Sequence, residues 1–331
     1  MRAAWYEHQG SPRESLVVGE MPDPVPGAGE VRIAVTVSGM SPGDVKKRAG
    51  WPGSPMTFPR VIPHSDGAGI IDAVGMGVSA GRVGEHVWCY GAQSYRPFGT
   101  AAEYVTVPSA LAVTLPQDPA GRDTLDEQAS CLGIAGITAH RAIFADGAPG
   151  GLVVLVYGAT GGVGSIATQL ARGSGATVLA VVRGEEQLGQ ARALGARQAF
   201  LDGDPALAER IRQAAPDGVH RIADVDFAAH ADLNAEILAI GGAISSYSTS
   251  AGRPAIPYWA FGFKDTTLRL LGSDDFSPAV KAAAAQALTG ALTAGSLRSE
   301  IGARFPLDQI ASAHELVERG APARVVLSIH G

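Results

Sequence analysis

The chain has 331 residues, of which 46% are hydrophobic and 18% are charged, and its formal net charge is −6. This length exceeds the usual size of a single domain, so two domains are expected. The acidic balance argues against a dedicated nucleic-acid-binding protein, which would carry a basic face. With 43 glycines and 21 prolines, the composition favours a turn-rich α/β protein over a helical bundle.

The sequence shows no sign of export or membrane insertion. The N-terminal segment MRAAWYEHQG lacks the apolar core of a signal peptide. The longest apolar stretches, such as LVVLVYGA, are well short of the ~20 residues that a membrane span needs. Cys89 and Cys131 are too few for a disulfide framework or a cysteine-based zinc site. We therefore expect a soluble, cytoplasmic protein that binds neither nucleic acid nor a membrane.

The first part of the chain is rich in short β-branched runs. From Glu30 to about Pro116 these runs alternate with clusters of glycine and proline, a spacing that predicts a β-rich barrel or sandwich. The runs are EVRIAVTVSG, GAGIIDAVG, GEHVWCYG and GTAAEYVTVP.

Near residue 126 the pattern changes to alternating strands and helices. A helical pattern, LDEQASCLGIAGITAHRAIF, opens this region, and the segments GSIATQLARGSG and GEEQLGQARALGA are among the later helices. The predicted strands are Leu152–Tyr157, Thr177–Val182, Ala199–Leu201, Ile222–Asp226, Ala243–Ser246 and Thr267–Leu271. This rhythm predicts a doubly wound parallel sheet. Beyond it we expect helices over 279–294 and PLDQIASAHELVERG, then a last strand, RVVLSIH.

The most informative segment joins the first two strands of this sheet. It reads Ala159-Thr160-Gly161-Gly162-Val163-Gly164 and departs from G-x-G-x-x-G only at its first position, where Ala159 stands. A strand precedes it and a helix follows, which is the context that a dinucleotide-binding turn requires. Gly161 would let the backbone approach a pyrophosphate, the helix N-terminus would offer N–H groups to it, and Gly164 would allow close packing of helix and strand.

The residue after the second strand chooses between the two nicotinamide cofactors. An NAD site carries an acidic residue there, but this chain has Arg183. A guanidinium binds a 2′-phosphate through paired hydrogen bonds, whereas a carboxylate would repel it. Arg183 therefore favours NADPH, with a solvated surface arginine as the alternative.

Several motifs in order give the chain a resemblance to a known superfamily. They are SGMSPGDVKKRAG, PHSDGAGIIDAVGMGVSAGRVGEHVW, GIAGITAHRAI, YGATGGVGSIATQLA and FPLDQIASAHELVERG. Nearly from end to end, the chain resembles the zinc-free, zeta-crystallin-like quinone oxidoreductases of the medium-chain dehydrogenase/reductase superfamily. The resemblance implies a GroES-like catalytic domain over 1–126 and 273–331, with an NADP-binding Rossmann domain over 127–272. It also implies a homodimer formed through the last Rossmann strand, around Thr267–Leu271.

The zinc alcohol dehydrogenases of the same superfamily provide a contrast. Their three ligand positions fall on Ser41, Ser65 and Ile134 here, and none of these supplies a thiolate, imidazole or carboxylate. No metal site is therefore expected. His64 stands one residue before the zinc histidine position, so a role in the turn is favoured over a substrate contact and over metal ligation. Asp66 is expected to cap or brace the same turn.

Ser41 and Trp51 are the candidate catalytic residues on the substrate side. The resemblance implies an asparagine at the position of Ser41 and a tyrosine at that of Pro52 in many relatives. Ser41 would donate one hydrogen bond to a substrate carbonyl, or else cap a turn. Trp51 would form a flat stacking wall, or else pack as a structural residue. Asp44 is expected to hold the local fold.

Further residues are placed beside the cofactor by the resemblance alone. Tyr247 and Ser248 would lie along the ribose–nicotinamide half, while Gly272 and Ser273 would lie near the nicotinamide amide. Thr138 would also lie near the nicotinamide. Their alternative role is in ordinary turns at strand ends. His314 borders an apolar stripe of a predicted helix and is expected to pack there.

Without a Lewis acid to activate an alcohol, hydride delivery to an acceptor that is already electron-poor remains the easiest chemistry. We therefore expect NADPH-dependent, zinc-independent reduction of a quinone or an α,β-unsaturated carbonyl, as the resemblance also implies. One alternative is an enoyl-thioester (enoyl-CoA or carrier) reductase, with Lys46, Lys47 and Arg48 at a basic mouth. Another is an NADPH-binding protein without catalytic activity.

Overall fold

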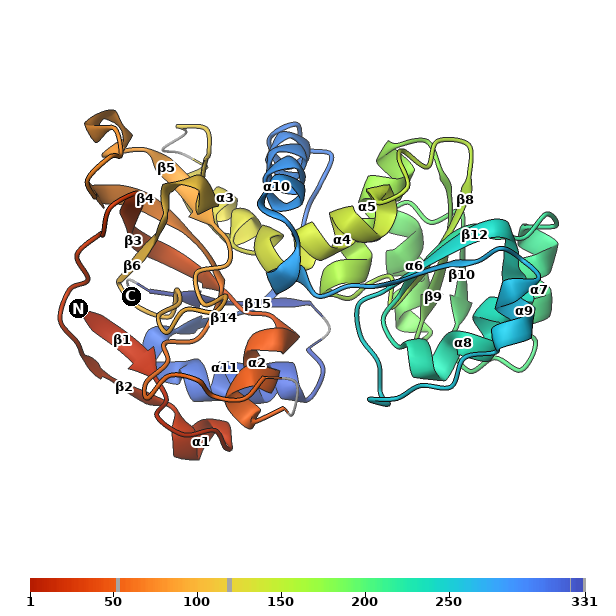
Figure 1. Cartoon of the computed structure of the whole chain (residues 1–331), viewed down its shortest axis with the longest axis horizontal. Coiled ribbons are helices and arrows are strands. Elements are labelled where there is room, and N and C mark those ends of the chain that lie inside the picture. Colours follow the sequence, from red (N-terminus) through yellow and green to blue (C-terminus); the bar gives the residue numbers. More distant parts are fainter. Residues whose placement is uncertain (52–53, 118–120, 322, 330–331) are drawn as a thin grey trace. The chain divides into compact units, whose positions relative to one another are not determined.

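The structure, a computed structural model, describes residues 1–51, 54–117, 121–321 and 323–329. The chain divides into two compact units (Figure 1). Unit 1 comprises Met1–Ala135 and Ser277–Gly331, and unit 2 comprises Gly136–Phe276. Each unit has a core of its own, and the glycine-rich segment 159–164 lies entirely in unit 2.

Unit 1 is built on a mostly antiparallel sheet. Over the described ranges this sheet has seven strands, in the order β14-β15-β3-β4-β5-β7, with β6 paired to β3. Their bounds are β3 (Glu30–Gly39), β4 (Asp66–Val74), β5 (His86–Cys89), β6 (Tyr104–Pro108), β7 (Ala112–Thr114), β14 (Ile301–Pro306) and β15 (Arg324–Ser328). Alternate residues of β3, among them Val31, Ile33 and Val35, enter the core, as the period of two in its sequence requires.

The remaining elements of unit 1 surround this sheet. They are β1 (Arg2–Trp5), β2 (Val17–Glu20), α1 (Pro12–Ser15), α2 (Pro42–Ala49), α3 (Arg122–Ala129), α10 (Pro278–Thr293) and α11 (Ile310–Glu318). Leu307, Ile310 and Ala313 join the core that the sheet forms. The C-terminal part of the chain therefore completes the β-rich unit that the N-terminal part begins.

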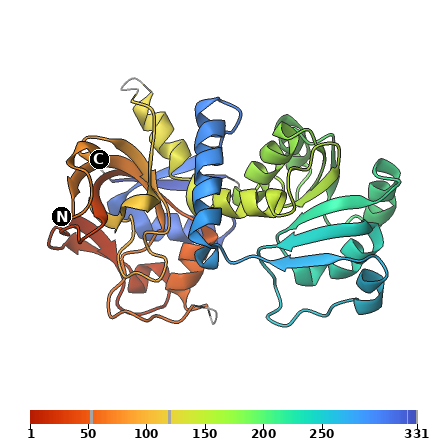
Figure 2. The same ribbon diagram turned by 45° about the horizontal axis from the view of Figure 1, so that its top comes forward.

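Unit 2 contains a parallel sheet with the order β10-β9-β8-β11-β12-β13 (Figure 2). The strands are β8 (Val153–Tyr157), β9 (Thr177–Val182), β10 (Gln198–Leu201), β11 (Val219–Asp224), β12 (Leu238–Ser246) and β13 (Thr267–Leu270). The order reverses between β8 and β11, which is the switch point where doubly wound sheets bind ligands. The predicted parallel sheet is confirmed.

Helices cover both faces of this sheet. They are α4 (Ile137–Phe144), α5 (Gly162–Gly173), α6 (Glu186–Ala193), α7 (Leu207–Ala214), α8 (Phe227–Ile237) and α9 (Tyr258–Gly262). Ile211 of α7, Phe227 of α8 and Phe261 of α9 share one cluster with Leu155 and Val181 of the sheet. Right-handed crossovers place α5 and α6 on the opposite face.

The single helical pattern predicted over 125–144 is wrong, because the structure interrupts it. Helix α3 ends at Ala129, a π-helical turn follows over Leu132–Gly136, and α4 begins at Ile137. The reason is a close approach: a Cβ atom at Gly133 would lie 1.9 Å from Oδ1 of Asp66. The backbone bends around this carboxylate instead of continuing the helix.

Two predicted strand ends also need correction. The strand predicted over Ile222–Asp226 ends at Asp224, because the Asp224 carboxylate accepts a hydrogen bond from the N–H of Asp226 at 2.8 Å and closes a turn. The last strand ends at Ser328, and His330, which was predicted to belong to it, lies outside the described residues. No helix in the described ranges has the length and apolar character needed to cross a bilayer.

Candidate functional site

The glycine-rich segment after β8 forms a tight turn from strand to helix. Gly158 has a φ of +60°, and Gly161 is the N-cap of α5. A Cβ atom at Gly164 would lie 2.1 Å from the carbonyl oxygen of Gly158. Glycine is thus required at Gly164 for α5 to pack this closely against the end of β8.

The start of α5 offers backbone donors to a ligand. The N–H groups of Gly162 and Val163 make no hydrogen bond with any part of the chain that the structure describes. Such groups at a helix N-terminus bind phosphate, because they point outward at the positive end of the helix dipole. The side chains of Ala159 and Thr160 are buried, so the backbone forms the available surface.

Arg183 follows β9 and its side chain is exposed. Gln187 Oε1 accepts hydrogen bonds from the N–H groups of Arg183 and Gly184, each at 3.1 Å, and this holds the turn. The Arg183 guanidinium has neither an ion pair nor a hydrogen bond within residues 1–51, 54–117, 121–321 and 323–329. A free guanidinium near a glycine-rich turn at a helix N-terminus is suited to bind a phosphate group.

The other residues assigned to the cofactor lie at several places in unit 2. Thr138 is buried in α4, Gly272 follows β13, and Ser273 opens a 3₁₀ turn. Tyr247 follows β12, and its N–H donates to the carbonyl of Asp224 at 3.0 Å. Burial and the nearby Asp224 charge raise the pKa of the Tyr247 phenol, which stays protonated.

The carbonyl of Ser248 ties the same segment to the next helix. It accepts hydrogen bonds from the N–H of Phe227 at 3.2 Å and from Ser246 Oγ at 3.0 Å. The backbone around Tyr247 and Ser248 is therefore held at the carboxyl ends of β11 and β12, the edge where a doubly wound sheet binds its ligand.

In unit 1, Ser41 begins α2 immediately after β3. Its N–H donates to Oδ2 of Asp44 at 2.8 Å, so Asp44 supplies one half of a capping box and holds the start of the helix. The Ser41 hydroxyl is buried; its oxygen faces the N–H of Asp44 in the other half of the box, and its O–H has no acceptor among the described residues. It is therefore a donor available to a ligand oxygen.

The residues at the three zinc-ligand positions do not fit a zinc ion. Two are serine hydroxyls, and Ser65 Oγ is buried without a partner in the described part of the chain. The third, Ile134, contributes only its N–H, which donates to Oδ2 of Asp66 at 2.7 Å. Zinc takes thiolate, imidazole or carboxylate ligands. Within the described ranges, no three His, Cys, Asp or Glu side chains are grouped to hold a metal.

His64 is fully buried and has a φ of +73°. Its Nδ1 lies 2.9 Å from Ser38 Oγ, and its Nε2 lies 3.0 Å from Nε2 of His314, whose ring stacks on it with the centroids 5.2 Å apart. Burial lowers the pKa of His64 to about 3. Burial and the neighbouring charges hold the pKa of His314 well below its usual value. Both imidazoles are therefore neutral.

The hydrogen-bond network decides which nitrogens carry the protons. Thr100 donates to the carbonyl of Asp66 at 2.7 Å, so the Ser38 hydroxyl must donate to Thr100 Oγ1 at 2.8 Å. His64 Nδ1–H then donates to Ser38, and His64 Nε2 accepts from Nε2–H of His314. His64 is thus an internal part of a buried network and presents no proton to a ligand.

The other predicted substrate-side residues lie at the end of α2. Trp51 is 53% exposed, and Lys46 Nζ lies 5.9 Å from the centre of its ring. Pro52 lies outside the described residues. Arg48 is fully buried, pairs with Glu318 and donates to the carbonyl of Gly10. The predicted basic mouth is therefore wrong at Arg48, because this guanidinium is already bound inside unit 1.

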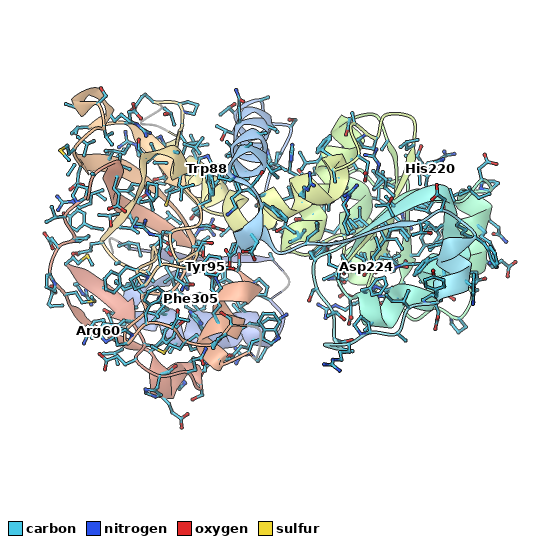
Figure 3. All side chains as sticks on the ribbon, viewed as in Figure 1. Arg60, Trp88, Tyr95, His220, Asp224 and Phe305 are labelled. Carbon is cyan, nitrogen blue, oxygen red and sulfur yellow. The ribbon has the colours of Figure 1, made fainter. Side chains whose placement is uncertain are left out.

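A buried polar network in unit 2 was missed from the sequence. The Asp224 carboxylate, labelled in Figure 3, accepts from His230 Nδ1 at 2.7 Å and from Asn234 Nδ2 at 2.8 Å. Tyr157 donates to Asn234 Oδ1 at 2.9 Å and stacks on His230 with the ring centroids 3.9 Å apart. The available signal was an acid ending a buried strand, followed by two polar residues four apart on the next helix.

Comparison with known proteins places these features in a family. A model described as an alcohol dehydrogenase GroES-like domain matches residues 27–117, and one described as a zinc-binding dehydrogenase matches residues 162–285. The quinone oxidoreductase of Rattus norvegicus is 31% identical over 324 residues, covering 95% of this chain and 93% of that protein. The quinone oxidoreductase of Homo sapiens is 28% identical over 333 residues, covering 98% and 95%.

Solved structures agree with these matches. A mycobacterial quinone oxidoreductase is 26% identical with a TM-score of 0.86, covering 99% of this chain and all of that one. A mycobacterial protein solved in complex with NADPH is 26% identical with a TM-score of 0.85 and the same coverage. An NAD-dependent alcohol dehydrogenase is also 26% identical, with a TM-score of 0.86 and full coverage of both chains. The predicted α/β architecture, a GroES-like part with a Rossmann part, is confirmed.

Proposed function

Since the chain belongs to the quinone oxidoreductase branch of the medium-chain dehydrogenase/reductase superfamily, we propose that it is an NADPH-dependent, zinc-independent reductase. Its acceptor is a quinone or an α,β-unsaturated carbonyl. The observation that carries this proposal is the free Arg183 guanidinium after the second strand of the nucleotide sheet. The relative solved with NADPH supports the same choice of cofactor.

Different residues of unit 2 bind different parts of the dinucleotide. The N–H groups of Gly162 and Val163 bind the pyrophosphate, and Arg183 binds the 2′-phosphate. The ribose and nicotinamide are bordered by the remaining residues assigned to the cofactor: Thr138, Tyr247, Ser248, Gly272 and Ser273. When bound, the reduced nicotinamide supplies a hydride. The protein's part is to orient the acceptor and exclude water.

On the substrate side, Ser41 donates a hydrogen bond to the acceptor oxygen. Its O–H is buried without an acceptor among the described residues, so no hydrogen bond that it donates has to break first. Trp51 provides a flat surface beside α2. One neutral donor polarises an oxygen far less than a metal does, which restricts the reaction to acceptors that are already electron-poor. The final proton comes from water, because His64 and His314 are neutral and bound to each other.

The function is tested by following NADPH oxidation with a naphthoquinone, a simple enone, an enoyl-CoA and an aldehyde, each repeated with NADH. We expect turnover of the quinone or the enone, with NADPH preferred, and no loss of activity after dialysis against a chelator. Turnover of the enoyl-CoA alone would contradict the proposed acceptor class. Tight NADPH binding without turnover of any acceptor would contradict the proposed catalysis.

The same assay with Arg183→Asp examines the cofactor assignment. We expect NADPH affinity to fall roughly 100-fold, since a charge-assisted pair worth about 3 kcal/mol is replaced by repulsion. Arg197→Asp is the matched control, because Arg197 is also exposed but precedes β10 at the other end of the sheet. An equal loss of NADPH affinity in the two variants would show that the net charge of the protein, and not the position of Arg183, controls NADPH binding.

We also propose that two copies pair through the edge of the unit 2 sheet. Strand β13 is the outer strand there (Figure 2), pairing only with β12 among the described strands. The segments around it expose large apolar side chains, which we call the edge patch: Ile240, Tyr258, Trp259, Phe263 and Leu270, each at least 68% exposed. Apolar surface beside an unpaired strand edge is a liability in a monomer and is covered by a second copy of the same edge.

Leu270→Glu combined with Trp259→Glu is expected to abolish this pairing, because charges in an apolar interface lose their hydration. Light scattering coupled to size exclusion should give twice the chain mass for the wild type and about 33.9 kDa for the double variant. Met76→Glu is the control, since Met76 is 81% exposed in a turn of unit 1. A wild-type mass of one chain would contradict the dimer.

A further inference from the structure

A cluster of polar groups, four of them ionisable, lies at the carboxyl edge of the unit 2 sheet, outside the residues assigned above. We call it the edge cluster: Tyr157, Asp202, Asp224, His230 and Asn234. His230 joins its two acidic residues. His230 Nδ1 donates to Asp224 Oδ1 at 2.7 Å, while Nε2 lies 3.8 Å from Asp202 Oδ2. His230 is 6% exposed and Asp224 is fully buried, whereas the side chain of Asp202 is 40% exposed.

Asp202 is the next neighbour of Arg183 across the sheet. Strands β10 and β9 pair in parallel with Leu201 opposite Val182, and the N–H of Asp202 donates to the carbonyl of Val182 at 2.7 Å. The residues that follow this pair are Asp202 and Arg183. A carboxylate and the guanidinium assigned to the 2′-phosphate therefore leave adjacent strands at the same level.

The alternation of side chains along the strands puts both groups on one face. Val181 and Phe200 are paired and belong to the core cluster that includes Phe227 of α8. Arg183 and Asp202 stand two residues further on, directly after the ends of these strands, where the same alternation directs them to that face. The contact between Asp202 and His230 of α8 agrees with this placement.

We infer that Asp202, held by His230, sets how strongly this protein prefers NADPH over NADH. The inference rests on the proposed function, since it concerns the same dinucleotide site. The Asp202 carboxylate opposes the 2′-phosphate that Arg183 attracts, but it does not oppose the 2′-hydroxyl of NADH. Protonated His230 offsets the charge of Asp202 and so favours NADPH, and neutral His230 leaves that charge uncompensated.

The charges around His230 determine the direction of the pH effect. Burial lowers its pKa, but the hydrogen bond to Asp224 and the charges of Asp224, Asp202 and Asp226 outweigh this, and the pKa is raised above its ordinary value. The Tyr157 ring stacks on that of His230, and burial raises the pKa of its phenol, which stays protonated. The phenol of Tyr247 also stays protonated and donates to the carbonyl of Tyr157 at 3.5 Å. His230 therefore keeps its proton to a higher pH than an ordinary imidazole does, and it loses that proton as the pH rises.

The 2′-phosphate itself titrates in the opposite sense. A phosphate monoester has a second pKa of about 6, so acid removes charge from NADPH and weakens its pairing with Arg183. A preference for NADPH that grows as the pH falls toward 6.5 therefore points to the protein and not to the cofactor. This difference in sign separates the action of His230 from that of the ligand.

The test is a fluorescence titration of the protein with NADPH and with NADH between pH 6.5 and 9, which measures binding without turnover. Two unit charges about 8 Å apart, at an effective dielectric constant of about 40, change an affinity roughly five-fold. We expect Asp202→Asn to raise the ratio of NADPH to NADH affinity at least about five-fold at pH 8.5. We expect His230→Gln to give, at pH 6.5, the lower ratio that the wild type shows at pH 9.

Two further variants separate the possible failures. Asp217→Asn removes an exposed carboxylate before β11, at the other end of the sheet, and should leave the ratio unchanged. Thermal melts establish whether His230→Gln is folded. Because the Asp202 side chain is half-exposed, Asp202→Asn measures the effect on the affinity ratio without disturbing the core. An unchanged ratio in Asp202→Asn, together with weakened NADPH binding in Arg183→Asp, would overturn this inference and leave the proposed function intact. A wild type that binds neither dinucleotide would overturn both.

Discussion

Gly164→Val is expected to reduce NADPH affinity at least about 100-fold, because it displaces the helix that presents the phosphate-binding N–H groups. The valine Cβ would meet the carbonyl oxygen of Gly158 at 2.1 Å and its carbonyl carbon at 2.7 Å. Neither backbone atom can rotate away, so α5 itself must move. Loss of two charge-assisted hydrogen bonds, each worth about 1.5 kcal/mol, accounts for roughly this factor.

The measurement is a fluorescence titration with NADPH, accompanied by thermal melts. Overpacking of this kind also costs about 1–3 kcal/mol of stability, so a lower melting temperature is expected as well. Gly173→Val is the matched control: Gly173 ends the same helix, and nothing lies within 4 Å of the position its Cβ would take. If Gly164→Val binds NADPH as the wild type does, the described turn is not where the pyrophosphate binds.

The buried pair of His64 and His314 is expected to make the protein unstable in mild acid. An imidazole in the unfolded chain has a pKa of about 6.5. Below that pH the unfolded chain therefore binds protons, whereas the buried pair in the folded state stays neutral. In the folded state His64 stays neutral down to its pKa of about 3. Each such imidazole therefore lowers the free energy of unfolding by about 1.4 kcal/mol per pH unit below pH 6.5.

Urea denaturation at pH 7.5, 6 and 5 measures this slope. In His314→Gln one of the two titrating groups is gone while an amide can still donate to His64, so the slope should fall by about 1.4 kcal/mol per pH unit. His8→Gln, on an exposed side chain, is the control and should leave the slope unchanged. An unchanged slope in His314→Gln would mean that the pair is already protonated in the folded state.

Two other histidines act in the opposite direction, which is why variants must be compared with the wild type. A hydrogen bond to Asp126 raises the pKa of His86, and the acids of the edge cluster raise that of His230. Each contributes stability that is fully present below its unfolded pKa and is lost as the pH rises through its folded pKa. The net profile of the wild type therefore combines both signs.

Some features of this protein follow from the sequence by itself because they depend on neighbours along the chain. The run VVLVY and the glycine-rich turn after it determine a buried strand entering a helix, since the apolar period and the conformational needs of glycine are local properties. Arg183 could be found in the same way, because its distance from the turn is set by the length of one helix and one strand. The predicted strand Thr177–Val182 matches β9 for this reason.

Other features were decided only by the tertiary structure. His64 and His314 are 250 positions apart, and no local pattern reports that their Nε2 atoms meet at 3.0 Å. The break in the helical pattern near Gly133 depends on the carboxylate of Asp66, which lies at the start of β4.

The same holds for Asp202, whose contact with His230 needs both the order of the strands and the face on which α8 packs. Periodicity along the chain determines which residues are buried and in which element. Which buried polar groups pair, and hence which of them keep or lose a proton, is decided by contacts between elements that the sequence leaves far apart.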